Sequence, residues 1–309
     1  MSLRTQPQAA APPGEPGSQS RGVLLGFAWF AATCLLFAAP LARFVRYALA
    51  NDNASHAILI PAISLWVLYL ERRRIFPAAA GKLDLRCASF FFVPAVLAAA
   101  ACFLYGSRWS ELNQLSLWVL ALILFWAAGF AALYGYETVR RASFPLAFLV
   151  LTIPIPDFLL DKTIYFLQKG TTEISAVLFD WSGVPVLRDG FVFHLAHVNI
   201  EVARECSGIR SSLALVILAI LVAHFYLRRF WRQAALVLVG LFVMILKNAI
   251  RIVTLTLLAS YVDPGFLSGN LHREGGVVFF LLGLALMAPV LWWLERGERE
   301  PAEAAVASD

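Results

Sequence analysis

Cys206 is the residue of this chain best suited to act as a nucleophile. It stands in the polar run Arg-Glu-Cys-Ser-Gly-Ile-Arg, where a loop leads into an apolar segment. A cysteine at a helix N-terminus, with the cation Arg210 one turn further on, is expected to favour its reactive thiolate form. The other interpretation of Cys206 is a small residue that is simply buried.

Arg251 lies inside an apolar segment that begins near Ala234, about 25 Å along the helix at ~1.5 Å per residue. The chain stays apolar over 252–258, which favours a guanidinium turned inward to a polar site over one that reaches the membrane surface. Asn248, three residues earlier, shares its helical face. Lys247 can share that face too, and two cations there would need an anionic partner.

His272 stands in the loop Gly-Asn-Leu-His-Arg-Glu-Gly-Gly, just before the last apolar segment. A lone histidine in a loop is usually only solvated. The topology predicted below, however, places His272 on the same membrane face as Cys206 and Arg251. Thiolate, imidazole and guanidinium are the nucleophile, the acid–base group and the oxyanion donor that acyl transfer needs.

The remaining polar candidates are weaker. His56, at the outer end of an apolar segment, could assist the site or be structural. Glu201 and Glu205 flank the cysteine, where a carboxylate could orient the histidine or pair with an arginine. His194 and His197 point to opposite faces if they lie on a strand, so they predict no metal site. No nucleotide, dinucleotide or zinc-protease motif is present, and we expect no cofactor.

The elements that position these residues must be membrane helices. The chain is 60% hydrophobic and 15% charged, with a mean hydropathy of +0.74, whereas soluble chains are ~45–50% apolar and ~25% charged. The apolar residues come in blocks of bilayer length. We predict an all-α polytopic membrane protein with about eight transmembrane helices. The approximate spans are Val23–Leu41, Ala54–Leu70, Cys87–Tyr105, Leu115–Gly135, Phe144–Leu160, Ile209–Leu227, Ala234–Tyr261 and Gly276–Leu294.

Basic residues predict the orientation. The gaps on one side hold clusters such as Arg72–Arg74, Arg140–Arg141 and Arg228–Arg229, and short cytoplasmic loops carry such an excess. Both termini are therefore predicted to be cytoplasmic. We expect a disordered tail over 1–22, a membrane domain over 23–294 and a second cytoplasmic tail over 295–309. The net charge of +5 reflects topology, so we expect the lipid bilayer and no nucleic acid as partner.

The gap between the fifth and sixth spans, Asp161–Gly208, is long enough for a small outer-face insertion. Ile164–Phe179 has the pattern of an amphipathic helix that lies in the membrane interface. Asp189–Gly190 is a hairpin signal. Phe191–Val202 then predicts a return strand that leads to the sixth span. We expect the chemistry at this insertion.

Several of these motifs resemble those of the exosortase/archaeosortase family. Glu201-Val-Ala-Arg-Glu-Cys-Ser-Gly-Ile-Arg-Ser-Ser is similar to its nucleophile motif, although Arg204 and Ser212 depart from the usual residues. Asn248-Ala-Ile-Arg-Ile is similar to its arginine segment, and His272 with Gly275–Gly276 to its histidine segment. Ser55-His56, followed by Pro61, Trp66 and Arg72–Arg74, is similar to its early membrane segment, and Gly183-Val-Pro-Val to the stretch before its return strand. The resemblance covers roughly residues 25–295.

The resemblance implies a cysteine protease or transpeptidase of the bacterial inner membrane. Its substrates would be exported proteins whose C-terminal tail has a Pro-Glu-Pro-type motif, a transmembrane helix and a basic cluster. The acyl group would pass to an unknown acceptor or to water, usually in exopolysaccharide-producing bacteria. The chain ends 15 residues after the last span, so we expect a form without the family's additional soluble domain. The catalytic residues would be Cys206, Arg251 and His272, with Arg210, Asn248, Glu205 and His56 as supporting residues.

Two other functions fit part of the sequence. A transporter or channel could line an anion path with Lys247, Asn248 and Arg251, but it does not explain a thiol in a helix-capping polar motif. A glycan- or lipid-modifying enzyme of the envelope would use the same face but has no need for a cysteine acyl carrier.

Overall fold

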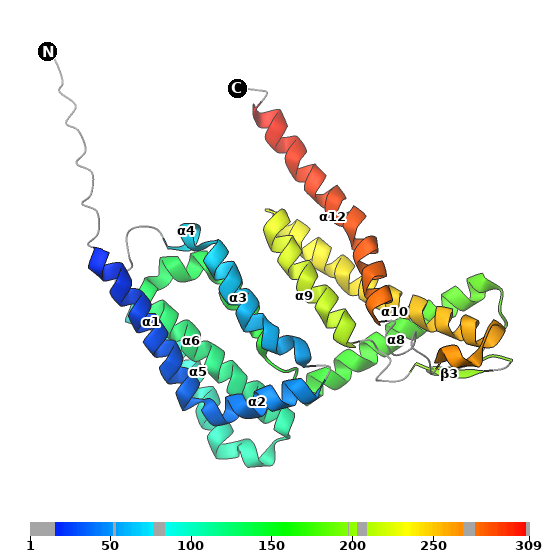
Figure 1. Cartoon of the computed structure of the whole chain (residues 1–309), viewed down its shortest axis with the longest axis horizontal. Coiled ribbons are helices and arrows are strands. Elements are labelled where there is room, and N and C mark those ends of the chain that lie inside the picture. The colour runs from blue at the N-terminus through cyan, green and yellow to red at the C-terminus, as the bar shows by residue number, and fades with distance from the viewer. Residues whose placement is uncertain are drawn as a thin grey trace. The chain divides into compact units, whose positions relative to one another are not determined.

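The computed structural model describes residues 16–51, 54–76, 84–196, 198–202, 209–267 and 276–306 (Figure 1). The chain is mostly helical and divides into two compact units, Met1–Pro156 and Asp157–Asp309. Each unit has its own hydrophobic clusters, and each is described by itself below.

The first unit is built around α6, a long helix that packs against α5 and α1. Asp84 begins α5 by accepting a hydrogen bond from the backbone N–H of Cys87 (3.0 Å), which is an ordinary helix cap. The helices are α1 (Pro16–Leu36), α2 (Ala38–Ala50), η1 (Ser55–Ile58), α3 (Leu59–Leu70), α4 (Arg72–Ile75), α5 (Leu85–Tyr105), η2 (Gly106–Arg108), α6 (Glu111–Arg141), α7 (Ser143–Phe148) and η3 (Leu149–Thr152).

Tryptophans join α1 to α6. The indole N–H of Trp29 donates to the backbone oxygen of Phe125 (2.8 Å), and that of Trp126 donates to the hydroxyl of Thr33 (3.0 Å). A Cβ at Gly129 would lie 2.1 Å from the Trp29 ring, so only glycine lets the ring pack against α6 at this point. These contacts satisfy polar groups that would be costly to bury unpaired.

The second unit comprises α8 (Asp157–Ser182), a small sheet and three further long helices. The sheet has the order β1-β2-β3, with strands Leu187–Asp189, Val192–His194 and Asn199–Glu201, all antiparallel. The helices are α9 (Ile209–Tyr226), α10 (Phe230–Tyr261) and α12 (Gly276–Val306), and η5 (Pro264–Leu267) follows α10.

The turn between β1 and β2 falls at Asp189–Gly190, and Gly190 has a φ of 58°, the left-handed conformation that glycine adopts most easily. The chain that returns from this turn is two strands, not the single strand expected over Phe191–Val202. It folds back between β2 and β3, where the N–H of Leu195 donates to the oxygen of Val198 (2.9 Å).

The predicted fifth span, Phe144–Leu160, is wrong as a continuous helix. The helical chain ends at Thr152, and α8 begins at Asp157 and runs through the segment expected to be a separate interfacial helix. Pro154 and Pro156 lie in the break. Proline has no N–H to donate and disfavours helical backbone in the residue before it, so the helix cannot continue there.

The structure supports a polytopic membrane protein. Among the described residues, four helices are long and apolar enough to cross a bilayer, or six segments if two bent pairs each count as one span. Two shorter apolar helices, Ser55–Leu70 and Leu213–Tyr226, coincide with the predicted second and sixth spans. α1 already begins at Pro16, within the predicted tail, and α12 continues beyond the predicted end of the last span.

Candidate active site

Among the predicted catalytic residues, Arg251 is the one that the structure describes; it lies in α10 and is half-buried. Cys206 and His272, and with them Glu205, lie outside the described residues. Arg210 belongs to the first turn of α9, but its side chain is also outside the described part. The site is therefore built from Arg251 and from the chain segments that flank the cysteine and the histidine.

α10 carries two buried polar side chains one turn before Arg251. Lys247 and Asn248 are each only 2% exposed. The amide nitrogen of Asn248 lies 3.4 Å from the hydroxyl oxygen of Thr171 in α8 and donates to it. Buried polar groups in a membrane helix are costly and mark functional positions.

α8 faces this part of α10 with a polar stripe. Gln168, Thr171, Thr172 and Ser175 are between 0 and 7% exposed, and their i, i+3, i+4, i+7 spacing places them on one helical face. Large apolar residues of the same helix, among them Phe166 and Trp181, are exposed instead. The helix thus buries its uncharged polar side chains, while charged ones such as Lys169 and Glu173 are exposed.

These α8 residues were not among the predicted members of the site. The amphipathic pattern indicates an interfacial helix, so their side chains were expected to face water. The signal that could have identified them is the stripe itself, because four uncharged hydrogen-bonding residues at this spacing share one helical face.

Close packing brings α8 against α10. A Cβ at Gly170 would lie 3.2 Å from the side chain of Ile245, so a larger residue would force the helices apart. Within the stripe, the hydroxyl of Thr172 donates to the backbone oxygen of Gln168 (2.8 Å). The buried hydroxyl of Ser175 has no hydrogen-bond partner among the described residues.

Val202, four residues before Cys206, is fixed from two sides. Its carbonyl oxygen accepts a 2.6 Å hydrogen bond from the side-chain amide of Gln168, and its N–H donates to the oxygen of Phe191 (2.9 Å). It is fully buried, in one hydrophobic cluster with Ile252 and Val253, the two residues that follow Arg251. The chain that leads to the cysteine therefore leaves the sheet beside the arginine-bearing turn of α10.

The sheet is attached to α8 by an ion pair and by ring packing. Arg188 donates two hydrogen bonds to the carboxylate of Glu173 (2.8 and 2.9 Å), which raises the pKa of the guanidinium above its ordinary value. Phe179 and Phe193 pack with ring centroids 5.1 Å apart. These contacts attach β1 and β2 to α8. β3, the strand before Val202, pairs with β2 and is therefore held near α8 as well.

The N-terminal ends of α9 and α12 lie at the level of Arg251. A Cβ at Gly283 in α12 would contact Leu215 of α9 (3.2 Å) and Lys247 of α10 (3.6 Å), so the three helices meet at this height. α9 and α12 both run antiparallel to α10, since Ala219 lies beside Gly240 and Leu294 beside Arg232. One turn further along α10, at Arg251, the other two helices are therefore near their first residues.

Those first residues follow the two undescribed catalytic segments directly. α9 begins at Ile209, three residues after Cys206, and α12 begins at Gly276, four residues after His272. The fold thus gathers at one end of the unit the arginine and the chain ends that carry the cysteine and the histidine.

The first unit holds His56, the remaining supporting residue of the prediction. It lies in η1 and is half-buried, and its ring Nδ1 has no hydrogen-bond partner within the described ranges. In the second unit, Nδ1 of His194 lies 3.0 Å from the side-chain oxygen of Asn199. Among the described residues, no group of three or more histidine, cysteine or acidic side chains could hold a metal ion.

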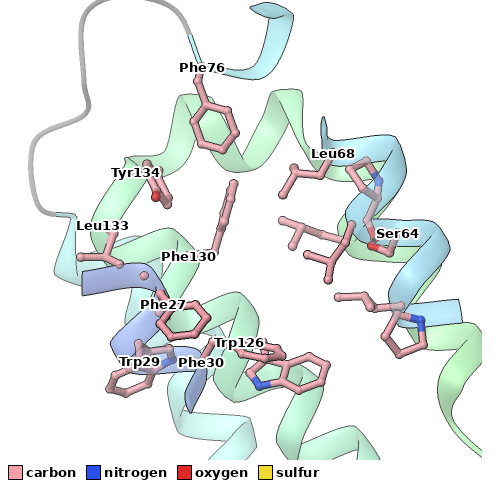
Figure 2. A pocket seen from close by; sticks show the side chains of 17 residues that line it. Phe27, Trp29, Phe30, Ser64, Leu68, Phe76, Trp126, Phe130, Leu133 and Tyr134 are labelled. Atoms are coloured by element: carbon pink, nitrogen blue, oxygen red, sulfur yellow. Dashed lines mark hydrogen bonds between the residues drawn. The ribbon is translucent and has the colours of Figure 1, made fainter. Parts of the chain in front are cut away.

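The first unit also contains an apolar cavity of about 390 Å³ between α1, α3 and α6 (Figure 2). Aromatic rings that include Phe27, Phe30, Trp126 and Phe130 surround it. Two hydroxyl groups line it, those of Ser64 and Tyr134, and that of Ser64 donates to the backbone oxygen of Pro145 (2.6 Å). The cavity can take a hydrocarbon group, and its described lining holds no cysteine, histidine or charged side chain.

One family comparison matches most of the chain. The model of the transmembrane exosortase family matches residues 45–289, more than three quarters of the chain. The chain belongs to the transmembrane exosortase family. Membership makes it, in general terms, a multi-pass membrane protein of a family of sorting proteases and transpeptidases. Comparison with curated proteins and with solved structures gave no match.

Proposed function

We propose that this exosortase cleaves the C-terminal sorting tails of exported proteins through an acyl-enzyme on Cys206. The observation that carries the proposal is the position of Val202. Its hydrogen bond to Gln168 and its packing on Ile252 hold the chain beside Arg251. Four residues of extended chain reach at most ~14 Å, so a cysteine four residues after Val202 is within reach of this turn of α10, which supports the proposal.

In the proposed mechanism, the Cys206 thiolate attacks the carbonyl carbon of the scissile peptide bond. A C–S bond forms, and Arg251 donates hydrogen bonds to the oxyanion or to an acidic group of the substrate. His272 gives a proton to the leaving nitrogen as the C–N bond breaks. An amine acceptor or water then attacks the thioester, regenerates the thiolate and returns a proton to the imidazole.

The proposed substrate tail has a Pro-Glu-Pro-type motif, a transmembrane helix and a basic cluster. Its helix would enter from the bilayer and leave the motif at the outer face. We propose eight spans in a bacterial inner membrane, with both termini in the cytoplasm and the active site outside. Arg210, Glu205, Asn248 and His56 are proposed as supporting residues.

The deciding experiment is to trap the acyl-enzyme. The protein is co-expressed with an exported substrate that bears such a tail, and mass spectrometry searches for a thioester at Cys206. We expect the adduct and tail cleavage in the wild type and in Cys34→Ala, which removes a half-buried thiol from the first unit. Both should vanish in Cys206→Ala.

The substitution Cys206→Ser separates chemistry from folding, because it changes one atom. It should accumulate in the membrane at the wild-type level and leave the tail uncut. If Cys206→Ala cuts the tail as fast as the wild type, the cysteine is not the nucleophile. The transporter and the glycan- or lipid-modifying enzyme would then be the better interpretations.

A further inference from the structure

A second cavity, of about 350 Å³, lies between the start of α10 and residues 292–297 of α12, far along α10 from Arg251. Its volume falls in the ~300–1,000 Å³ range of ligand sites. It is lined by three tryptophans and two arginines: Trp231, Trp292, Trp293, Arg232 and Arg296. The proposed catalytic reaction makes no use of this cavity.

Arg232 is the buried cation of the cavity, only 9% exposed. Its two Nη atoms donate to the backbone oxygens of Leu294 (2.7 Å) and Gly297 (2.9 Å), and its buried Nε has no hydrogen-bond partner among the described residues. A Cβ at Gly297 would lie 3.1 Å from Nη2, so glycine makes room for the guanidinium. Both hydrogen bonds are thus accepted by neutral carbonyl oxygens.

The surroundings of the cavity are basic. Arg296 stacks on Trp292 with its Cζ 5.5 Å from the ring centroid, and Arg232 lies over Trp231 at 5.0 Å. The carboxylate of Glu298 already accepts the backbone N–H groups of Arg228 and Arg229 (2.9 and 3.0 Å) at the start of α10. Four arginines here outnumber two glutamates: Arg228, Arg229, Arg232 and Arg296 against Glu295 and Glu298.

The rim of the cavity is apolar and exposed. Trp231, Trp292 and Trp293 are 54, 60 and 67% exposed, at the ends of two helices apolar enough to cross a bilayer. Tryptophan at such a position lies at the level of the lipid headgroups. A ligand here meets positive charge inside the cavity and hydrocarbon at its rim.

We propose that this cavity binds the phosphodiester headgroup of an anionic phospholipid, with the acyl chains against the exposed tryptophans. Basic pockets between transmembrane helices recognise such headgroups by charge, and guanidinium groups pair well with phosphate oxygens. The lipid would bridge α10 and α12 at the end of the unit opposite to Arg251. This inference does not depend on the proposed catalytic function.

The test uses the full chain, purified in a neutral detergent, with native mass spectrometry to measure bound lipid. Phosphatidylglycerol should bind at least tenfold more tightly than phosphatidylcholine of the same chain length. Arg296→Gln should weaken phosphatidylglycerol binding about fivefold, the effect of one arginine near a charged membrane surface. Gly297→Ala should weaken it as well, because the new methyl group displaces the Arg232 guanidinium.

The matched control is Arg140→Gln, which removes an exposed arginine at the end of α6. It should leave phosphatidylglycerol binding unchanged. Equal binding of the two lipids, or an equal loss in Arg296→Gln and Arg140→Gln, would overturn the proposal. So would inorganic phosphate that displaces the lipid at an equal concentration, because the site would then recognise the free anion. The Arg296→Gln comparison decides the question even if Gly297→Ala fails to fold.

Discussion

Two arginines of α10, Arg232 and Arg251, have different surroundings. Arg232, near the start of the helix, gives its Nη atoms to two carbonyl oxygens of α12 and lies over a tryptophan ring. Arg251 is half-buried about 28 Å further along, at ~1.5 Å per residue, and is preceded by Lys247 and Asn248. Its neighbours are the polar stripe of α8 and the chain ends that lead to the cysteine and the histidine.

This difference in surroundings indicates a structural role for one arginine and a functional role for the other. An arginine that donates to the backbone of another helix contributes to stability, because both partners would otherwise be buried unsatisfied. Arg251 instead lies beside buried polar side chains and near the first residues of α9 and α12, where the proposed mechanism places the substrate. The same residue type on one helix should therefore give opposite results when it is replaced.

Arg251→Gln should have the largest effect on activity. We expect tail cleavage to fall about 10²–10³-fold, the usual loss when one oxyanion donor is removed, with the thermal unfolding midpoint close to that of the wild type. Single-turnover cleavage of a tail peptide by the reconstituted protein measures the first quantity, and unfolding in detergent measures the second. If the variant instead has a lower unfolding midpoint and a normal cleavage rate per folded molecule, Arg251 serves stability, as Arg232 does.

Arg232→Gln should give the reverse result. It removes two hydrogen bonds from a charged donor, each worth about 1.5–3 kcal/mol, so the free energy of unfolding should fall by roughly 3–6 kcal/mol. The cleavage rate per folded molecule should stay within about twofold of the wild type. A loss of cleavage by Arg232→Gln at unchanged stability would contradict the structural role assigned to Arg232.

Gln168→Leu tests the support of the cysteine-bearing segment. It leaves the buried oxygen of Val202 unsatisfied, which costs about 1–3 kcal/mol locally, so cleavage should slow roughly tenfold or more. Thr256→Val is the matched control, because this buried hydroxyl bonds only within α10, to the oxygen of Ile252. Equal cleavage by the two variants would show that the bond to Val202 does not position the site.

The ion pair between Arg188 and Glu173 should matter least. Both side chains are partly exposed, at 33 and 55%, and such pairs contribute about 0.2–1 kcal/mol. A double-mutant cycle with Arg188→Gln and Glu173→Gln measures this coupling energy, which should shrink as salt is added. A coupling above about 2 kcal/mol that resists salt would mean that the sheet depends on this pair.

The sequence locates most of the long helices because apolar blocks of bilayer length are local signals, although the chain of the predicted first span, Val23–Leu41, bends by 77° between Leu36 and Ala38. The Asp189–Gly190 turn is equally local, since only the conformation of glycine is needed there. The continuous fifth span was wrong because hydropathy outweighed Pro154 and Pro156, although prolines at that spacing break a helix. Apolar content identifies membrane chain but does not locate its breaks.

The candidate site was only partly predictable. Asn248 and Arg251 were chosen because polar residues are rare in an apolar helix. Thr171, which binds Asn248, was not chosen, because the partner of a polar stripe depends on which helices touch. That contact rests on Gly170 and Ile245, which are 75 positions apart, and no local pattern contains it.

The polar stripe of α8 has a consequence for how the protein is assembled. Little hydrophobic driving force brings helices together inside a bilayer, so close packing and hydrogen bonds must do so. α8 meets α10 through a glycine and through amide and hydroxyl groups. Its docking is therefore a step of association that follows insertion of α10. The buried polar side chains of α8 would then find their partners only once the whole second unit has been inserted.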